Sequence, residues 1–311
     1  AEELGTDGVF EAQVALGTDA VVGNVITVNG TPYTVTQADI DAGFLTATIA
    51  VAADGEVAIR AEARDAAGNV DVADTTVQVI TVDTTAPATP AAPTSYADNV
   101  GDIQNPASTA VTTDDRTPGL NIGGGLTDTP TLYVDGVAVD AVYDPLTGTL
   151  TPTVPLSPGE HQLSYTLTDA AGNESAQSPA LTLTVDTTAP TLTITSSDLE
   201  LGAGETSTIT FQFSEDVAGF TASDVVVAGG TLSNFVQVDA NTWTATFTQS
   251  GTAAPSISVA NGAYSDAAGN AGVGDVLDGT DGFIFNPTAS DLIGAITIPE
   301  DVNGDGIINA E

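Results

Sequence analysis

The chain has 311 residues, which is long for one hydrophobic core and typical of two or three domains. Its 42 acidic residues stand against only 3 basic ones, all arginine, and the formal net charge is -39. This balance excludes nucleic acid as a partner, because no basic patch exists to displace counterions from phosphates. No apolar run approaches the roughly 20 residues of a bilayer span, so no membrane insertion is expected. Cysteine is absent, which excludes disulfides and thiolate metal sites.

Apolar and polar residues alternate with a period of two along most of the chain, a pattern that predicts β-strands. In chain order the predicted strands are Val9–Leu16, Phe44–Val51, Glu56–Arg64, Glu160–Thr168, Ala180–Val185, Ser207–Phe213 and Asn241–Gln249. Turn dipeptides such as Asn29-Gly30 and Asp135-Gly136 separate them. No long window has helical period, and at most one turn of helix is predicted at Gln37–Ala42 and at Ala222–Val225.

Two internal repeats set the domain organisation. The pentapeptide Asp-Ala-Ala-Gly-Asn, called the marker turn below, starts at Asp65, Asp169 and Asp266, at spacings of 104 and 97 residues. The phrase Thr-Val-Asp-Thr-Thr-Ala-Pro starts at Thr81 and again 103 residues later at Thr184. A period of about 100 residues is the size of one β-sandwich. We therefore predict an all-β protein of three tandem immunoglobulin-like antiparallel sandwiches arranged as an extended rod.

The markers also predict the boundaries. The sandwiches are expected at 1–82, 83–185 and 186–290, the third being the most divergent, and 291–311 is expected to begin a further repeat. The linkers that start at Asp83 and Asp186 are short, rich in β-branched residues and end in proline, which favours stiff joints.

The marker turn, followed by a strand and then Val-Asp-Thr-Thr-Ala-Pro, resembles the bacterial immunoglobulin-like repeats. The resemblance is strongest over residues 83–185 and weakens over 198–260. Such repeats form the extender regions of giant bacterial surface and biofilm adhesins, many of them secreted by the type I route together with repeats-in-toxin modules. The resemblance implies a calcium-stiffened stalk on the outside of a bacterial cell, whose immediate partners are the neighbouring repeats of the same chain.

A calcium loop is predicted near the end of the chain. A twelve-residue loop of this kind supplies oxygen ligands from positions 1, 3, 5, 7, 9 and 12, with glycine at position 6. The first five of these positions are filled by Asp301, Asn303, Asp305, the carbonyl of Ile307, and Asn309. Position 12 would be residue 312.

The same loop suggests a longer repeat. Ala310-Glu311 repeats Ala1-Glu2, and Glu3 then stands where position 12 is expected. On this interpretation 291–311 begins another copy of the first sandwich and carries a first strand that the first sandwich lacks here. End-to-end self-association through 291–311 is therefore expected, by addition of this strand to the next molecule.

A second group of calcium sites is predicted at the joints. In a seven-stranded sandwich the last hairpin loop lies at the same end as the N-terminus, so each marker turn is expected beside the linker that enters its own domain. Converging carboxylates repel one another unless a cation bridges them, and calcium suits an all-oxygen site. The predicted ligands are Asp83 with Asp169 and Asn173, Asp186 with Asp266 and Asn270, and Asp65 with Asn69 in the first sandwich. The alternative is that these residues only form tight turns.

A third acidic cluster in the second sandwich comprises Asp98, Asp102 and Asp114, with Asp115 beside them. A cation could pin the long loop there, and a solvated acidic surface is the alternative.

We do not expect an enzyme, because no cysteine nucleophile or Gly-x-Ser-x-Gly elbow is present. The leading hypothesis is a structural spacer of a cell-surface adhesin. The alternatives are a sugar- or protein-binding third sandwich, in which Trp243, Phe235 and Phe220 are the available aromatics, and an accessory sandwich array of a secreted hydrolase. The acidity also fits adaptation to high salt.

Overall fold

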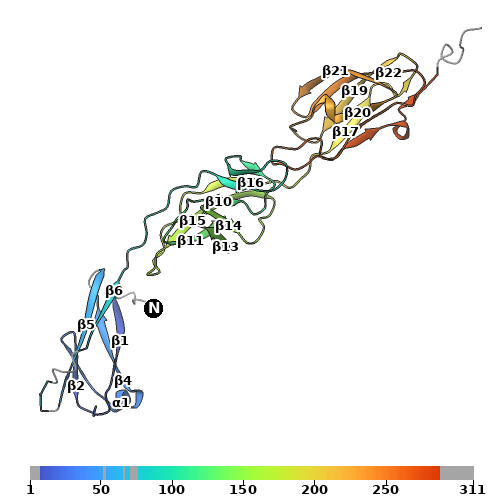
Figure 1. The fold of residues 1–311 in the computed structure, drawn as a ribbon. Helices are drawn as coiled ribbons and strands as arrows, with labels where there is room; N and C mark the ends of the chain where they lie inside the picture. Colours follow the sequence, from blue (N-terminus) through green and yellow to red (C-terminus); the bar gives the residue numbers. More distant parts are fainter. Residues whose placement is uncertain (1–7, 52–53, 66, 71–75, 288–311) are drawn as a thin grey trace, which may run out of the picture. The chain divides into compact units, whose positions relative to one another are not determined.

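The computed structural model describes residues 8–51, 54–65, 67–70 and 76–287. It confirms the all-β prediction, because antiparallel sheets dominate and three sandwiches follow one another along the chain (Figure 1). Packing divides the chain into two units. The first contains residues up to Pro90 together with 127–130 and 166–177, and the second contains the remaining residues.

The first sandwich pairs a two-stranded sheet, order β1-β4, with a four-stranded sheet, order β3-β2-β5-β6. Its elements are β1 Val9–Ala15, β2 Val25–Val28, β3 Thr31–Thr34, α1 Gln37–Ala42, β4 Phe44–Ala50, β5 Gly55–Arg64 and β6 Thr76–Val82. A capping box between Thr36 and Asp39 starts the predicted turn of helix, and Gly43 ends it in the left-handed conformation. No helix in the described residues is long and apolar enough to cross a membrane.

The second sandwich has two five-stranded sheets, with orders β13-β14-β10-β7-β8 and β12-β11-β15-β16-β9. Its strands are β7 Tyr96–Asp98, β8 Asn105–Ser108, β9 Thr112–Thr113, β10 Gly119–Asn121, β11 Thr129–Val134, β12 Val137–Val139, β13 Ala141–Asp144, β14 Thr149–Pro152, β15 Gly159–Thr168 and β16 Leu181–Val185. The short strand β9 runs parallel to the last strand, β16.

The third sandwich has sheets of order β17-β19-β22-β21 and β20-β23-β24, with a parallel pair β18-β25 at one side. Its elements are β17 Leu192–Ser196, β18 Glu200–Leu201, β19 Thr206–Phe213, η2 Ala222–Asp224, β20 Val225–Ala228, β21 Gly230–Asp239, β22 Thr242–Gln249, β23 Ser256–Val259, β24 Asp275–Leu277, η3 Gly279–Asp281 and β25 Ile284–Phe285. The second predicted helical turn is the 3₁₀ turn η2.

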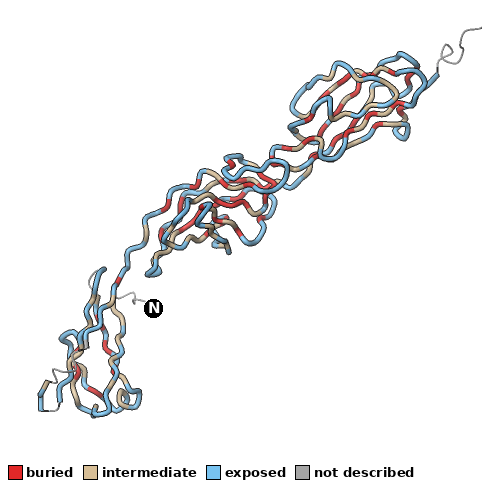
Figure 2. Tube along the Cα trace, in the orientation of Figure 1, coloured by how far each residue is buried: buried red, intermediate tan, exposed pale blue. Residues whose placement is uncertain are grey.

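The cores of the first and third sandwiches differ in how completely they are buried (Figure 2). In the third sandwich the inward side chains of β19, Ile209, Phe211 and Phe213, are at most 2% exposed. In the first sandwich the inward side chains of β1, such as Ala12 and Val14, are only half-buried. The third sandwich therefore has a closed apolar interior, whereas the first is open along β1.

Candidate metal centre

In all three marker turns the aspartate Oδ1 accepts the backbone N–H groups of the third and fifth residues, and its Oδ2 accepts the side-chain amide of the asparagine. In the third, Oδ1 of Asp266 accepts backbone N–H groups of Ala268, Gly269 and Asn270 at 2.8–2.9 Å, and its Oδ2 accepts the Asn270 side-chain amide at 2.8 Å. The fourth residue of the turn has a left-handed backbone, with φ of 105° at Gly269, which favours glycine there. Each turn is therefore closed by its own aspartate, without any outside partner.

The asparagine of the turn reaches the linker that enters the same sandwich. The amide of Asn173 donates to the carbonyl oxygen of Asp83 at 3.1 Å, and the amide of Asn270 donates to that of Asp186 at 2.9 Å. Turn and linker are thus adjacent at both joints, as the strand order of a sandwich requires. The structure brings these residues together, and whether they bind calcium stays a prediction.

Three carboxylates converge at the joint before the third sandwich. One oxygen each of Asp186, Glu215 and Asp266 lies within 4.8 Å of the others. Glu215 follows the end of β19, so the linker, the loop after this strand and the marker turn each contribute one acid. Asp266 is 2% exposed, and the other two are half-buried. Burial raises the pKa of Glu215, and the charges of Asp266 and Asp186 raise it further.

Loops of the second sandwich cover the marker turn of the third. The N–H of Asp102 donates to the carbonyl of Gly269 at 3.2 Å, and the N–H of Asp114 donates to that of Ala268 at 3.1 Å. A Cβ built at Gly101 would overlap the Asp114 carboxylate, so only glycine fits this contact. Backbone hydrogen bonds therefore join two successive sandwiches directly, and they exclude water from Asp266.

Asp114 brings a further carboxylate to this joint, and it lacks partners. The side chain is 9% exposed, and its buried Oδ1 has no hydrogen-bond partner. Burial raises the pKa of Asp114 to about 6, and the charges of Asp98 and Asp266 act in the same direction. By contrast, Asp98 accepts the Thr113 hydroxyl at 2.7 Å and the N–H of Val100 at 3.3 Å. Burial of an unpaired carboxylate costs folding free energy, so a positive charge beside Asp114 would stabilise the fold.

No basic side chain supplies that counter-charge in the part of the chain that the structure describes. Arg116 is exposed and donates through Nε to the carbonyl of Leu156 at 2.7 Å. His161 pairs with Asp135 at 2.8 Å, away from this joint. The described atoms at the joint that could bind a metal are carboxylate and carbonyl oxygens, with no nitrogen or sulfur ligand among them. This set fits a hard divalent cation such as calcium and not a metal that prefers imidazole or thiolate.

The other predicted sites differ from this joint. Asp83 is exposed, and its Oδ1 accepts the N–H of Thr85 at 3.0 Å, while Asp169 is half-buried. Asp65 and Asn69 are exposed and bond to each other at 2.8 Å, and no acid of a described linker lies beside them; the residues before Gly8 are outside the described part of the chain. Among the described residues the three-acid group at Asp186 stands alone. The predicted calcium loop, Asp301, Asn303, Asp305, Ile307 and Asn309, lies outside the described residues.

Two features of this site were not predicted from the sequence. Glu215 was missed because Ser214-Glu215-Asp216 has no counterpart in the repeats; an acidic pair directly after a strand was the available signal. The acids of the second sandwich were expected to form a separate cluster. The structure instead places Asp114 against the marker turn of the third sandwich, so that the two predicted groups meet at one joint.

Comparison with protein families assigns the two sandwiches that form this joint. Residues 92–187 match one family model described as a bacterial Ig-like domain, and residues 186–280 match a second with the same description. The second and third sandwiches are bacterial Ig-like domains. No curated protein matches the chain.

Three solved structures are similar to it at low identity. SGBP-B of the Bacteroides ovatus mixed-linkage glucan utilization locus, solved with a mixed-linkage heptasaccharide, is 15% identical with a TM-score of 0.20, over 89% of this chain and 64% of that one. Invasin, a bacterial integrin-binding protein, is 15% identical with a TM-score of 0.29, over 81% and 54%. The Escherichia coli adhesin FdeC is 16% identical with a TM-score of 0.34, over 89% and 87%. The chain thus spans less than two thirds of the length of the first two.

Proposed function

We propose that the chain is a calcium-stiffened spacer segment of a bacterial cell-surface adhesin and projects a distal adhesive domain away from the cell. The observation that carries this proposal is the joint at Asp186, where buried acids of two successive Ig-like domains meet beside cross-domain backbone hydrogen bonds. The tandem bacterial Ig-like domains support it. Membership of the repeats-in-toxin adhesins, and an extracellular location, belong to the same proposal.

At the joint, Asp186, Glu215 and Asp266 would hold the ion, which would supply positive charge and shared coordination, and Asp114 would add its negative charge nearby. The protein's own groups have already prepared the site. The Asp266 carboxylate is oriented by its turn, the Asn270 amide donates to the backbone carbonyl of Asp186, and loops of the second sandwich cover the turn that carries Asp266. Relief of repulsion among these acids would favour one joint angle over many. The joint at Asp83, whose acids are more exposed, and the loop that starts at Asp301 would bind further ions.

A charge-neutralising pair of variants tests the ion directly. Glu215→Gln removes one acid of the group, whereas Asp216→Asn removes its exposed neighbour, which lies outside the group. In chelator, Glu215→Gln is expected to melt above the wild type because repulsion falls. In millimolar calcium it is expected to melt below the wild type because a ligand is lost. Asp216→Asn should follow the wild type in both solutions, and melting curves that calcium leaves unchanged would remove the calcium proposal.

Small-angle scattering tests the spacer. Three sandwiches of about 40 Å in line would reach roughly 120 Å and give a radius of gyration near 35 Å, against about 20 Å for a compact chain of this size. We expect the extended value in calcium and a broader distribution of sizes in chelator. A radius near 20 Å in calcium would contradict the spacer function.

The alternative of a sugar-binding third sandwich has less support from the structure. Trp243 and Phe220 are 5% and 6% exposed, and they pack edge-to-face with ring centroids 5.5 Å apart. Phe235 is partly buried against the same cluster. These aromatics are core residues and form no exposed shelf on which a sugar ring could stack.

A further inference from the structure

The second and third sandwiches, called the complete sandwiches below, cover their sheet edges by a similar pairing of the first segment of the domain. In the second, β7 pairs with β10 of one sheet, and β9, further along the same segment, pairs in parallel with the last strand β16 of the other. In the third, β17 pairs with β19, and β18 then pairs in parallel with β25. In the second sandwich the first segment therefore crosses from one sheet to the other, and in the third it pairs first with the four-stranded sheet and then with the last strand, β25.

The first sandwich lacks this cover in its described residues. Among the described strands β1 pairs with β4 alone and β6 with β5 alone, so no described strand covers the outer edges of β1 and β6. These are the two edges that one crossing segment occupies in the second sandwich. Unpaired edges of this kind accept an additional strand through main-chain hydrogen bonds.

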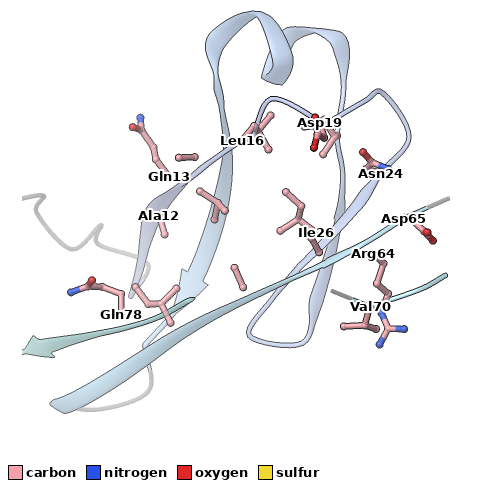
Figure 3. A pocket seen from close by; sticks show the side chains of 18 of the residues that line it. Ala12, Gln13, Leu16, Asp19, Asn24, Ile26, Arg64, Asp65, Val70 and Gln78 are labelled. Carbon is pink, nitrogen blue, oxygen red and sulfur yellow. The ribbon is translucent and has the colours of Figure 1, made fainter. Parts of the chain in front are cut away.

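A groove of about 1240 Å³ opens between these edges, and Figure 3 shows Ala12 and Leu16 on one side of it with Ile26 beyond. Its floor is apolar but poorly covered. Val14 and Ile59 are half-buried, and Gln78, which lines the groove from β6, is exposed. At the same place in the third sandwich, Leu192 and Ile194 of β17 are buried against the core. The groove is therefore suited to accept an additional β-strand with apolar side chains on one face.

The chain itself contains a sequence that could occupy this groove as a β-strand. Residues 296–298 read Ile-Thr-Ile, close to the Leu-Thr-Ile of residues 192–194 in β17. If Ala310-Glu311 corresponds to Ala1-Glu2, as the repeat interpretation predicts, residues 291–300 would precede β1 in the repeat order, in the position of a first strand. The seven residues before Gly8 have Leu4 as their one large apolar side chain and offer no such alternation.

We propose that the groove between β1 and β6 is the acceptor for a strand with the sequence of residues 291–300, and that in a solution of this chain a second copy supplies it. Ile296 and Ile298 fill the groove, as Leu192 and Ile194 do in the third sandwich. The N–H and C=O groups of the incoming strand pair with the edge of β1. Pro299 lacks an N–H and is compatible with an edge strand. This association does not depend on the metal joint.

Engineered cysteines test the docked register, because the chain has none of its own. In the third sandwich Thr193 of β17 lies opposite Gln212 of β19. The equivalent pair is Thr297 with Gln13 on β1, and directly opposed Cβ atoms lie about 5 Å apart, within disulfide range. A chain with Thr297→Cys is mixed with a size-tagged chain carrying Gln13→Cys, and Val226→Cys on the exposed face of β20 is the matched control.

We expect a heterodimer disulfide with Gln13→Cys and none with Val226→Cys. The disulfide should be lost when Ile296→Asp and Ile298→Asp are added to the donor, since charged side chains do not enter an apolar groove. Equal cross-linking to both acceptors, or cross-linking that survives the two aspartates, would overturn the proposal. Glu215→Gln is expected to leave cross-linking unchanged, which separates this association from the calcium proposal.

Sedimentation velocity on the unmodified chain provides an independent measurement. We expect larger species as the concentration rises, and we expect Ile296→Asp with Ile298→Asp to shift the association to concentrations at least about tenfold higher. Because these residues lie outside the described sandwiches, circular dichroism of the variant should match that of the wild type. A strictly monomeric wild-type chain at high concentration would overturn the proposal.

Discussion

The first and third sandwiches contain the same marker turn but surround it differently. Asp65 and Asp266 make the same hydrogen bonds to the backbone and to the asparagine four residues on. Asp65 is exposed, whereas Asp266 is 2% exposed, lies near two further acids and is covered by the second sandwich. Five identical residues therefore form one local structure with two chemical environments.

The same two sandwiches also differ in their cores. The strand β17 covers one edge of the third sandwich, whereas in the first no described strand pairs with the outer edge of β1. The sequence of the turn determines the conformation of its own backbone. The neighbours packed against that turn decide whether its carboxylate becomes a ligand, and the pairing of edge strands decides whether the core behind it is closed.

The largest expected effect comes from truncating matched core residues. Phe211→Ala removes a ring that is 0% exposed and packs 5.5 Å from Phe220, so we expect a loss of about 3–5 kcal/mol in the third sandwich. Val14→Ala in the half-open first sandwich should cost about 1 kcal/mol or less. Calorimetry of both variants measures the difference, and equal losses would show that the first core is closed in solution.

Calcium should distinguish the two marker turns. At a hundredfold excess over its dissociation constant, one ion stabilises the folded state by about 2.7 kcal/mol. We expect Asp266→Asn to abolish the calcium-induced rise in melting temperature, whereas Asp65→Asn retains it. The two substitutions disturb similar hydrogen bonds within the turn, and the comparison of each variant in calcium and in chelator isolates the effect of the ion. A rise that both variants lose equally would place the ion elsewhere.

Glycines at the two sites give the next effect. An alanine at Gly101 would overlap the Asp114 carboxylate in addition to adopting a φ of 66°, and we expect a loss of roughly 2–3 kcal/mol. Gly68 of the first marker turn has a φ of 87° and open space around it, so its replacement should cost about 1 kcal/mol from strain alone. Chemical denaturation compares the two, and similar losses would mean that the cross-domain contact is loose.

The smallest expected effect is a pH dependence of the folding stability, measured in chelator so that no calcium is bound at the joint. Because the pKa of Asp114 is raised to about 6, its contribution to folding is fully present below the unfolded pKa of 3.8 and is lost as the pH rises through 6. The difference in stability between the wild type and Asp114→Asn should therefore change between pH 4 and 7 and be flat above it. An Asp65→Asn control should show no such step near pH 6.

The strands with clear alternation were predicted closely from the sequence. Glu56–Arg64 became β5 from Gly55 to Arg64, and Ser207–Phe213 became β19 from Thr206 to Phe213. Their long period-two patterns bury one face, which fixes both type and register. Short crossing strands such as β9 and β18 were missed, because two residues carry no measurable periodicity and their pairing is set by a strand far along the chain.

The candidate site could be predicted only in part. Topology placed Asn270 beside Asp186, because a sandwich brings its last hairpin to the end where its linker enters. Glu215 and Asp114 approach through packing between loops of different domains, and no repeat or spacing in the sequence encodes that contact. The carboxylates that most need a counter-charge were therefore the hardest to assign.

The parallel pairing of first and last strands has a mechanical consequence for the complete sandwiches. In the third sandwich β18 and β25 run side by side in the same direction near the two ends of the domain. Tension applied through the chain pulls such strands past each other, so that their hydrogen bonds are loaded together in shear rather than opened one at a time. The second sandwich repeats the arrangement with β9 and β16. A domain of this design resists stretching at its termini, whereas the first sandwich has no such parallel pair among its described strands.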